Sequence, residues 1–382
     1  MELTTVAEDD EFRERVRTWL EEHVPREAPP PHGPALRHFD AAWQGAQYDG
    51  GYAGVSWPAE YGGCGLGLVQ QLIWFEEYAR ANAPDIGCHF VGVNHAGPTL
   101  IANAREDQKS AHLPGILRGE SVWCQGFSEP GAGSDLASLT TRGVVDGDSI
   151  VVSGQKIWTS FGDLADYQEL LVRTEPGSQR HQGLSWLICD MRTPGLDVRP
   201  IQTMAGTPEF CEVFYDEVRV PLANVVGEIG NGWRVAMSTL SFERGTGFVR
   251  EQLELLRRVR ELRDDLGKDA ARLADGARDR VAEALAQARA MYAMTLRLIS
   301  RSLHGQDPGV EPSQIRLHYS LLRQRTERLA LELAGLEGLL LTAAPENAAR
   351  SYLDSFKVTI GAGTKEIQRN IIGERGLGLP RS

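Results

Sequence analysis

The first third of the chain places its apolar residues at the spacing of an α-helix, with charged residues between them. The residues that would share one helical face are Phe12, Val16, Trp19, Leu20 and Val24. A proline-rich segment, residues 25–34, then interrupts this pattern. Helical spacing returns over residues 68–81 and recurs up to about residue 117. We therefore predict an N-terminal α-helical domain over residues 1–120.

From Trp123 onward the pattern changes to short runs that are rich in apolar and β-branched residues. These runs are residues 149–152, 169–172, 184–188 and 212–215. Turn signals, such as Asp-Gly-Asp at 146–148 and Pro-Gly at 194–195, separate the runs. Their length and spacing predict a middle antiparallel β domain, a barrel or a sandwich, over residues 121–225.

Helical spacing returns after Pro221. Residues 281–298 and 315–341 predict long amphipathic helices. The leucines expected in their apolar seams are Leu317, Leu321, Leu329, Leu333 and Leu336. The charged segment 257–280 is expected to be exposed and partly loop. Long helices with short connections predict a C-terminal four-helix-bundle domain over residues 226–382. Helices, then strands, then helices indicate an α+β fold with segregated parts.

Composition and charge narrow the classes of function. The chain has 382 residues, of which 42% are hydrophobic and 24% charged, which suits a soluble protein with a large core. The formal net charge of −12 argues against binding to nucleic acid or to an anionic membrane surface. No apolar run is long enough to span a bilayer, and the first residues show no secretory signal. The 5 cysteines are scattered without C-x-x-C spacing, so we expect a reducing, cytoplasmic compartment and neither a disulfide framework nor a metal site.

Two segments carry candidate chemistry. Residues 128–135 read SEPGAGSD, a glycine-rich turn in which Gly131 and Gly133 let the backbone approach a bulky anionic ligand. Residues 155–160 read QKIWTS and place an indole and two hydroxyls on a strand-like stretch. The Trp158 indole can cover the face of a flat aromatic cofactor, whose edge the neighbouring hydroxyls can hydrogen-bond. Taken singly, the first segment also fits an ordinary turn, and Trp158 also fits a core residue.

In this order and at this separation, the two segments resemble the flavin-binding segments of acyl-CoA dehydrogenases. Further stretches that resemble this family are WPAEYGG at 57–63, VRVP at 218–221, GNGW at 230–233, LSFER at 240–244 and GAGTKEIQRNIIGER at 361–375. These stretches span nearly the whole chain. The resemblance implies the fold of that family, with helices on either side of a β domain. It also implies FAD as cofactor, an acyl-CoA substrate and a role in the β-oxidation of fatty acids or steroid side chains.

The resemblance also assigns roles to individual residues. The positions that match flavin contacts are Phe127, Ser128, Gly133, Ser134, Trp158, Thr159, Ser160, Thr364 and Glu366. Among these, Trp158 would cover the flavin ring, Ser160 would lie near its N5 atom, and Thr364 would meet the nucleotide end. Many relatives have glutamine at the position of Glu366. A purely structural alternative exists for several of them, such as a helix N-cap for Thr364.

Desaturation of a thioester needs a base for the α-proton and a flavin that accepts hydride from the β-carbon. Familiar members of the family carry the base in a Tyr-Glu-Gly-Thr stretch, but here the matching position holds Ala362, which cannot take a proton. Other members place the base on the helix that opens the C-terminal bundle, as glutamate followed by arginine. Glu243 and Arg244 match that pattern. We expect Glu243 to be the base, the Ala362 N–H to be an oxyanion donor, and Ser134 and Arg244 to contact the substrate. The alternative for Glu243 is a surface carboxylate paired with Arg244 or Arg250.

A further departure concerns partners. Many relatives carry an Arg-x-x-Phe-Gly stretch that reaches a neighbouring subunit's flavin, and residues 257–280 lack it. This resembles subunits of heterotetrameric acyl-CoA dehydrogenases. Three alternatives follow. The chain is catalytic, either in a homotetramer or in a heterotetramer with a paralogous chain; or it is a non-catalytic or flavin-sharing subunit. The third alternative is a flavin oxidase or monooxygenase on the same fold. The family implies an electron-transferring flavoprotein as electron acceptor. His95 is a candidate to line the acyl pocket, or else an ordinary core histidine.

Overall fold

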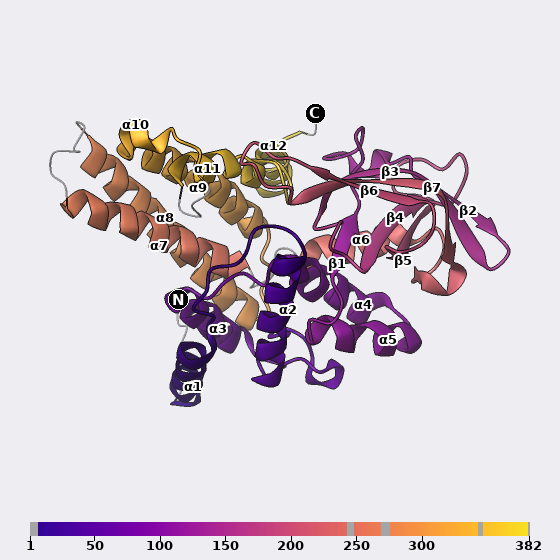
Figure 1. Ribbon diagram of the computed structural model, residues 1–382, viewed down its shortest axis with the longest axis horizontal. Helices are drawn as coiled ribbons and strands as arrows, with labels where there is room; N and C mark the ends of the chain where they lie inside the picture. Colours follow the sequence, from indigo (N-terminus) through magenta and orange to yellow (C-terminus); the bar gives the residue numbers. More distant parts are fainter. Residues whose placement is uncertain (1–6, 243–247, 269–275, 343–346, 381–382) are drawn as a thin grey trace.

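The computed structural model describes residues 7–242, 248–268, 276–342 and 347–380. Its first part is helical, as predicted (Figure 1). The principal helices are α1 (Ala7–His23), α2 (Pro34–Asp49), α3 (Leu68–Arg80), α4 (Gly97–Asn103) and α5 (Glu106–Leu117), with a π-helical turn at Gly92–Ala96. The periodic residues Phe12, Val16 and Leu20 are buried in one cluster with Trp43 and Trp74, which fixes α1 on α2 and α3.

A twisted sheet follows these helices. Its strands are β1 (Trp123–Gly126), β2 (Arg142–Asp146), β3 (Ser149–Ser160), β4 (Tyr167–Arg173), β5 (Leu184–Asp190), β6 (Leu196–Ile201), β7 (Phe210–Pro221) and β8 (Val225–Val226). The order along the sheet is β6-β7-β3-β2-β4-β5-β8, and β1 pairs with β4. Most neighbouring pairs are antiparallel, as predicted, whereas β4 pairs in parallel with β1 and, at one position, with β2.

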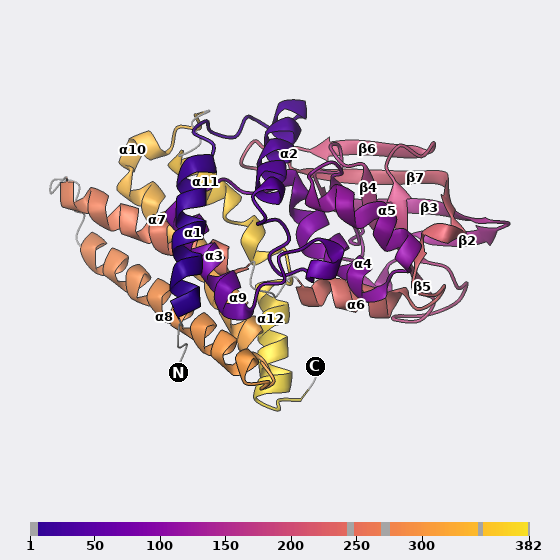
Figure 2. The same ribbon diagram turned by 90° about the horizontal axis from the view of Figure 1, so that it is seen from below.

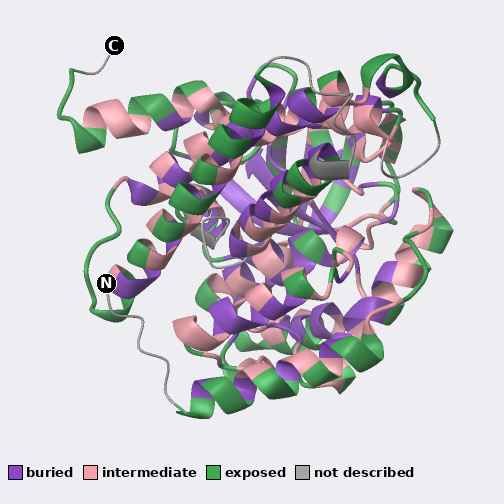
Figure 3. Cartoon of the chain, turned by 90° about the vertical axis from the view of Figure 1, so that its left-hand side faces the viewer, coloured by how far each residue is buried: buried purple, intermediate pink, exposed green. Residues whose placement is uncertain are grey.

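Helices resume after the sheet. They are α6 (Gly232–Phe242), α7 (Phe248–Lys268), α8 (Ala277–Leu303), α9 (Glu311–Leu333), α10 (Gly335–Gly338), α11 (Ala348–Asp354) and α12 (Lys365–Ile371). The long helices α7, α8 and α9 pack side by side at the opposite end of the molecule from the sheet (Figures 1 and 2). Buried residues such as Leu255, Met291 and Tyr319 fill the space between them. Figure 3 shows exposed residues on the outward faces of the helices and buried residues toward the interior.

Two expectations about this region were wrong. Residues 257–268 are helical, because Val259, Leu262 and Leu266 form a buried stripe between the charged residues of α7. Leu336 does not belong to a buried seam, since α9 ends at Leu333 and the Leu336 side chain is exposed. Residues 269–275 lie outside the described ranges.

Helix α6 joins the parts of the molecule. It begins at Gly232, where a Cβ atom would lie 2.5 Å from the Ser185 backbone, so glycine permits close packing of α6 on β5. On its other side, the Thr99 hydroxyl of α4 donates a hydrogen bond to Thr239 of α6 at 2.9 Å. The largest cluster of buried apolar residues therefore draws on the N-terminal helices, the sheet and α6. Within the described ranges, no helix is long and apolar enough to cross a membrane.

Candidate functional site

The glycine-rich turn and the tryptophan segment lie side by side. The Ile157 N–H donates a hydrogen bond to the Ser128 carbonyl oxygen at 2.9 Å. One residue earlier, the Lys156 ammonium donates to the Phe127 carbonyl oxygen at 2.9 Å. Residues that are distant in the sequence thus form one edge, where β1 runs into the turn and β3 passes beside it.

A buried ion pair holds this edge together. Lys156 Nζ lies 2.9 Å from Glu129 Oε1, and the Lys156 side chain is completely buried. The same carboxylate accepts hydrogen bonds from the Thr140 and Thr141 amides at 2.7 and 2.8 Å. Burial acts to raise the pKa of Glu129, but Lys156 and these donors outweigh it and lower the pKa to about 2. Sequence reasoning missed this pair, although each member lies inside one of the two motifs.

Trp158 is not a core residue. Its φ is 62°, and the pairing of β3 with β7 shifts register between Lys156 and Thr159, which is a β-bulge. The bulge turns the indole outward, so that 57% of Trp158 is exposed, with Phe210 edge-on at a centroid distance of 6.0 Å. A large flat side chain that a left-handed backbone exposes to solvent is a candidate ligand contact.

Polar groups next to Trp158 are able to form further hydrogen bonds. Thr159 is fully buried, and no described residue hydrogen-bonds its Oγ1 atom. Ser160 follows it and is half-buried. Across the edge, a Cβ atom at Gly131 or Gly133 would meet nothing within 4 Å, so the backbone of the turn faces open space. Ser134 is exposed beside it. An anionic or aromatic ligand can therefore approach both segments.

The C-terminal stretch forms a strained turn ahead of α12. Ala362 has φ 53° and Gly363 has φ 84°, and the Gln368 amide donates to the Ala362 carbonyl oxygen at 3.2 Å. Thr364 caps α12, because its hydroxyl oxygen accepts from the Ile367 N–H at 3.2 Å. The structural alternative for Thr364 is thus present. Glu366 is exposed.

Arg316 on α9 connects this turn to α7. Its Nη2 atom donates to the carbonyl oxygens of Val358 and Gly361 at 3.3 and 3.0 Å. Its Nη1 atom lies 3.7 Å from Glu251 Oε2, near the start of α7. The planar guanidinium thereby contacts two elements with one rigid fork, which lysine cannot do.

The resemblance implies that the Ala362 N–H is an oxyanion donor; on that expectation Arg316→Gln should lower kcat by up to about 100-fold, because this N–H would lose its fixed orientation. The KM for the thioester and the flavin content should change by less than about threefold, since Arg316 acts through the turn. Rapid-mixing measurement of flavin reduction tests this, with Arg328→Gln on the same helix as the matched control. Full activity in Arg316→Lys would contradict the proposed role of the planar Arg316 guanidinium in fixing the turn.

A hollow of about 100 Å³ lies between the N-terminal helices and the first turn of α7. Its lining includes Tyr78, Asn94, Arg250 and Glu251. Asn94 belongs to the π-helical turn, which packs against both β1 and α6. The hollow is therefore adjacent to the elements that lead into the glycine-rich turn and toward the end of α6.

His95 is a core histidine and does not line the hollow. Burial lowers the pKa of His95 to about 4, so the ring is neutral at physiological pH. Its Nδ1 atom lies 3.8 Å from Oε1 of the fully buried Glu169, which accepts a hydrogen bond from Gln125 at 2.7 Å. Its burial agrees with the alternative of a core histidine.

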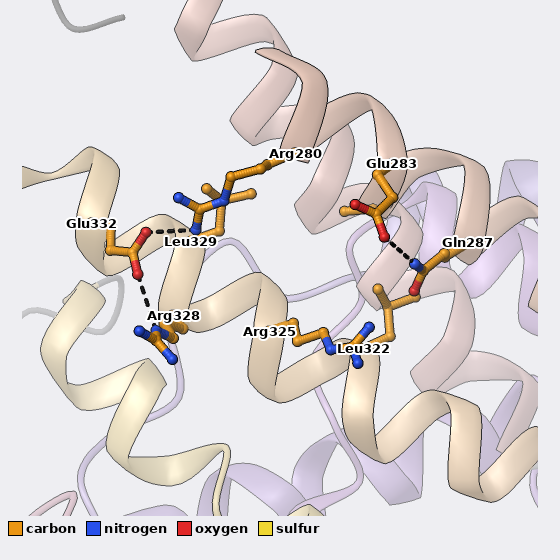
Figure 4. A pocket seen from close by; sticks show the side chains of 9 residues that line it. Arg280, Glu283, Gln287, Leu322, Arg325, Arg328, Leu329 and Glu332 are labelled. Carbon is orange, nitrogen blue, oxygen red and sulfur yellow. Dashed lines mark hydrogen bonds and ion pairs between the residues drawn. The ribbon is translucent and has the colours of Figure 1, made fainter. Parts of the chain in front are cut away.

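A second hollow, of about 330 Å³, lies between α8 and α9 (Figure 4). Charged and polar side chains pair around it: Arg280 and Arg328 both contact Glu332, and Gln287 donates to Glu283 at 2.7 Å. Its lining comes from α8 and α9, which belong to the helical bundle and not to the sheet domain (Figure 1). Among the described residues, its lining contains none of the candidate catalytic or cofactor-binding residues predicted from the sequence.

Glu243 and Arg244 lie outside the described residues. The structure describes α6 up to Phe242 and α7 from Phe248. Ala236 and Thr239, seven and four positions before Glu243, are fully buried. The first turn of α7 carries Arg250 and Glu251, which line the smaller hollow.

Comparison with known proteins identifies the family. Models of the acyl-CoA dehydrogenase N-terminal, middle and C-terminal domains match residues 6–120, 124–218 and 230–377. The acyl-CoA dehydrogenase IpdE1 of Mycobacterium tuberculosis (strain ATCC 25618 / H37Rv) is 41% identical over 384 residues, covering 97% of this chain and 98% of the relative. This chain belongs to the acyl-CoA dehydrogenase family. The family and the three-part architecture expected from the sequence are confirmed.

Solved structures of acyl-CoA dehydrogenases have the same fold. The structure named Tcur3481-Tcur3483 steroid ACAD superposes with a TM-score of 0.87 at 31% identity, and 100% of each chain is covered. The ChsE4-ChsE5 complex from Mycobacterium tuberculosis gives a TM-score of 0.83 at 32% identity, also with 100% of each chain covered. Both names describe assemblies of two different chains.

Proposed function

We propose that this chain binds FAD and catalyses the α,β-dehydrogenation of an acyl-CoA thioester, with Glu243 as the base that removes the α-proton. The observation that carries the proposal is the edge at which residues 127–129 meet 156–158. There the 2.9 Å hydrogen bond from Ile157 to Ser128 aligns the glycine-rich turn with the exposed Trp158 indole. Membership of the acyl-CoA dehydrogenase family supports the same reaction.

The residues at this edge fit FAD. An exposed indole offers a face to a flat ring, and the orphaned Thr159 hydroxyl offers a hydrogen-bonding group. The open backbone at Gly133 offers room for phosphates. The residues that would hold FAD are Phe127, Ser128, Gly133, Ser134, Trp158, Thr159, Ser160, Thr364 and Glu366. FAD, when bound, supplies the hydride acceptor for the β-carbon.

The chain's own groups would perform the remaining work on the thioester. Glu243 would remove the α-proton, a role for which a carboxyl needs a pKa near the working pH. The Ala362 N–H would stabilise negative charge on the thioester oxygen, a role that needs no side chain. Ser134 and Arg244 would contact the substrate. The name of one structural relative favours a steroid-derived acyl group, and an electron-transferring flavoprotein would reoxidise the flavin.

A second candidate function is a non-catalytic or flavin-sharing subunit of a heterotetramer. Two structural relatives are assemblies of two different chains. Moreover, four leucines that follow α9 are exposed, and exposed apolar side chains that are close in the sequence favour contact with another chain. These leucines are Leu336, Leu339, Leu340 and Leu341. A homotetramer remains the alternative assembly.

Bound FAD per chain, measured by visible absorbance after expression alone, separates these proposals. A self-sufficient enzyme should carry about one FAD per chain and should bleach anaerobically with an acyl-CoA. A folded protein without flavin that gains it on co-expression with a paralogous chain would support the heterotetramer. Absence of flavin under both conditions would overturn the proposed function.

A further inference from the structure

The smaller hollow is lined by aromatic walls and a polar end. Its aromatic residues are Tyr52, Trp74, Phe75, Tyr78 and Phe90. Flat side chains of this kind pack well against a ring, and about 100 Å³ is several times the space that a single water requires. The hollow therefore suits the cyclic end of an acyl group better than a long flexible chain.

The Arg250 and Asp85 side chains at this hollow already form ion pairs within the protein. Arg250 donates to Glu254 and pairs with Asp85 at 2.9 Å, and it stacks over the Tyr78 ring at 5.2 Å. Only 15% of the Arg250 side chain is exposed. Arg250 and Asp85 thus form a closed pair in the wall and have little capacity left for a ligand.

Glu251 differs from these residues. Its side chain is 42% exposed although it lines the hollow, and its ion-pair partner Arg316 is 3.7 Å away, beyond hydrogen-bond distance. Burial nevertheless raises the pKa of this carboxyl, against the opposing effects of Arg316 and the Tyr319 hydroxyl. A carboxylate has about four acceptor sites, so Glu251 retains acceptor capacity toward the hollow.

We propose that Glu251 is a specificity-determining residue that accepts a hydrogen bond from a hydroxyl on a cyclic acyl group seated in this hollow. The inference rests on the proposed dehydrogenase function and adds the chemical class of its substrate. A site that hydrogen-bonds a substrate hydroxyl discriminates against an analogue that lacks it, because that hydrogen bond is then not made.

The test compares 3-(4-hydroxycyclohexyl)propanoyl-CoA with 3-cyclohexylpropanoyl-CoA on the flavin-loaded protein, with its partner chain if the flavin requires one. Dissociation constants from calorimetry and kcat/KM with an artificial electron acceptor give two readouts. The native protein should favour the hydroxylated thioester by about 10- to 100-fold, as expected of a hydrogen bond to a charged acceptor. In Glu251→Gln this preference should fall by about tenfold, while the values for the cyclohexyl thioester stay near those of the native protein.

Glu261→Gln is the matched control, since Glu261 lies on the same helix, pairs with Arg257 and does not line the hollow. Its substrate preference should equal that of the native protein. Equal kcat/KM for the two thioesters in the native protein, or an unchanged preference in Glu251→Gln, would overturn the inference alone. If neither thioester bound or bleached the flavin, the dehydrogenase proposal would fall, and the inference with it.

Discussion

Replacing Glu243 by glutamine should lower kcat by about 100- to 10,000-fold, which is the usual contribution of a positioned general base. Glutamine keeps the size of the side chain but cannot accept the α-proton. The flavin content and the dissociation constant for the thioester should stay close to those of the native protein, because the proposed flavin contacts lie in the glycine-rich turn, on β3 and at the start of α12. Anaerobic flavin reduction by an acyl-CoA substrate measures the chemical step directly.

The matched control for this variant is Glu261→Gln, which removes a carboxylate of α7 that pairs with Arg257 and is 41% exposed. We expect its rate of flavin reduction to remain within about threefold of the native rate, since Glu261 is assigned neither to the flavin nor to the thioester. Turnover of Glu243→Gln within a few-fold of the native enzyme would show that another group takes the proton.

Lys156→Met should lower the free energy of unfolding by about 3–5 kcal/mol, because it leaves the buried Glu129 carboxylate without its cation. Lys156 is completely buried and also donates to the Phe127 carbonyl oxygen at 2.9 Å. The variant should therefore bind FAD more weakly as well. Denaturant unfolding with and without FAD measures both effects.

The double variant Lys156→Met/Glu129→Gln removes both charges and should recover part of the lost stability. The acid dependence gives an independent check. The pKa of Glu129 falls from 4.5 to about 2 on folding, so its stabilising contribution is present above about pH 4.5 and is lost as the pH falls toward 2. Acid unfolding of the double variant should lack this component. A stability in Lys156→Met equal to that of the native protein would contradict the role of the pair.

The sequence by itself determined the order of the parts. A period of 3.6 in the first and last thirds and short β-branched runs between them are local properties, and the described helices and strands follow them. The runs at 149–152 and 212–215 lie within β3 and β7, and the spacing over 68–81 became α3. The motifs also identified the family, because glycine-rich turns and aromatic contacts require particular residues at particular places. The many charged residues over 257–268 led to the prediction of an exposed, partly irregular segment. The structure has a helix there, in which Val259, Leu262 and Leu266 are buried.

Only the tertiary structure decided which of these residues meet. The exposure of Trp158 depends on a bulge that exists only once β3 pairs with β7. Lys156 and Glu129 are 27 positions apart, and Arg316 and Gly361 are 45 apart. The local period of the sequence shows which face of an element is apolar. Pairings between distant residues depend instead on how whole elements pack and on which buried polar groups then need hydrogen-bond partners. The polar end of the smaller hollow also depends on tertiary packing: Arg250 is paired with Asp85, whereas Glu251 keeps capacity to accept a hydrogen bond.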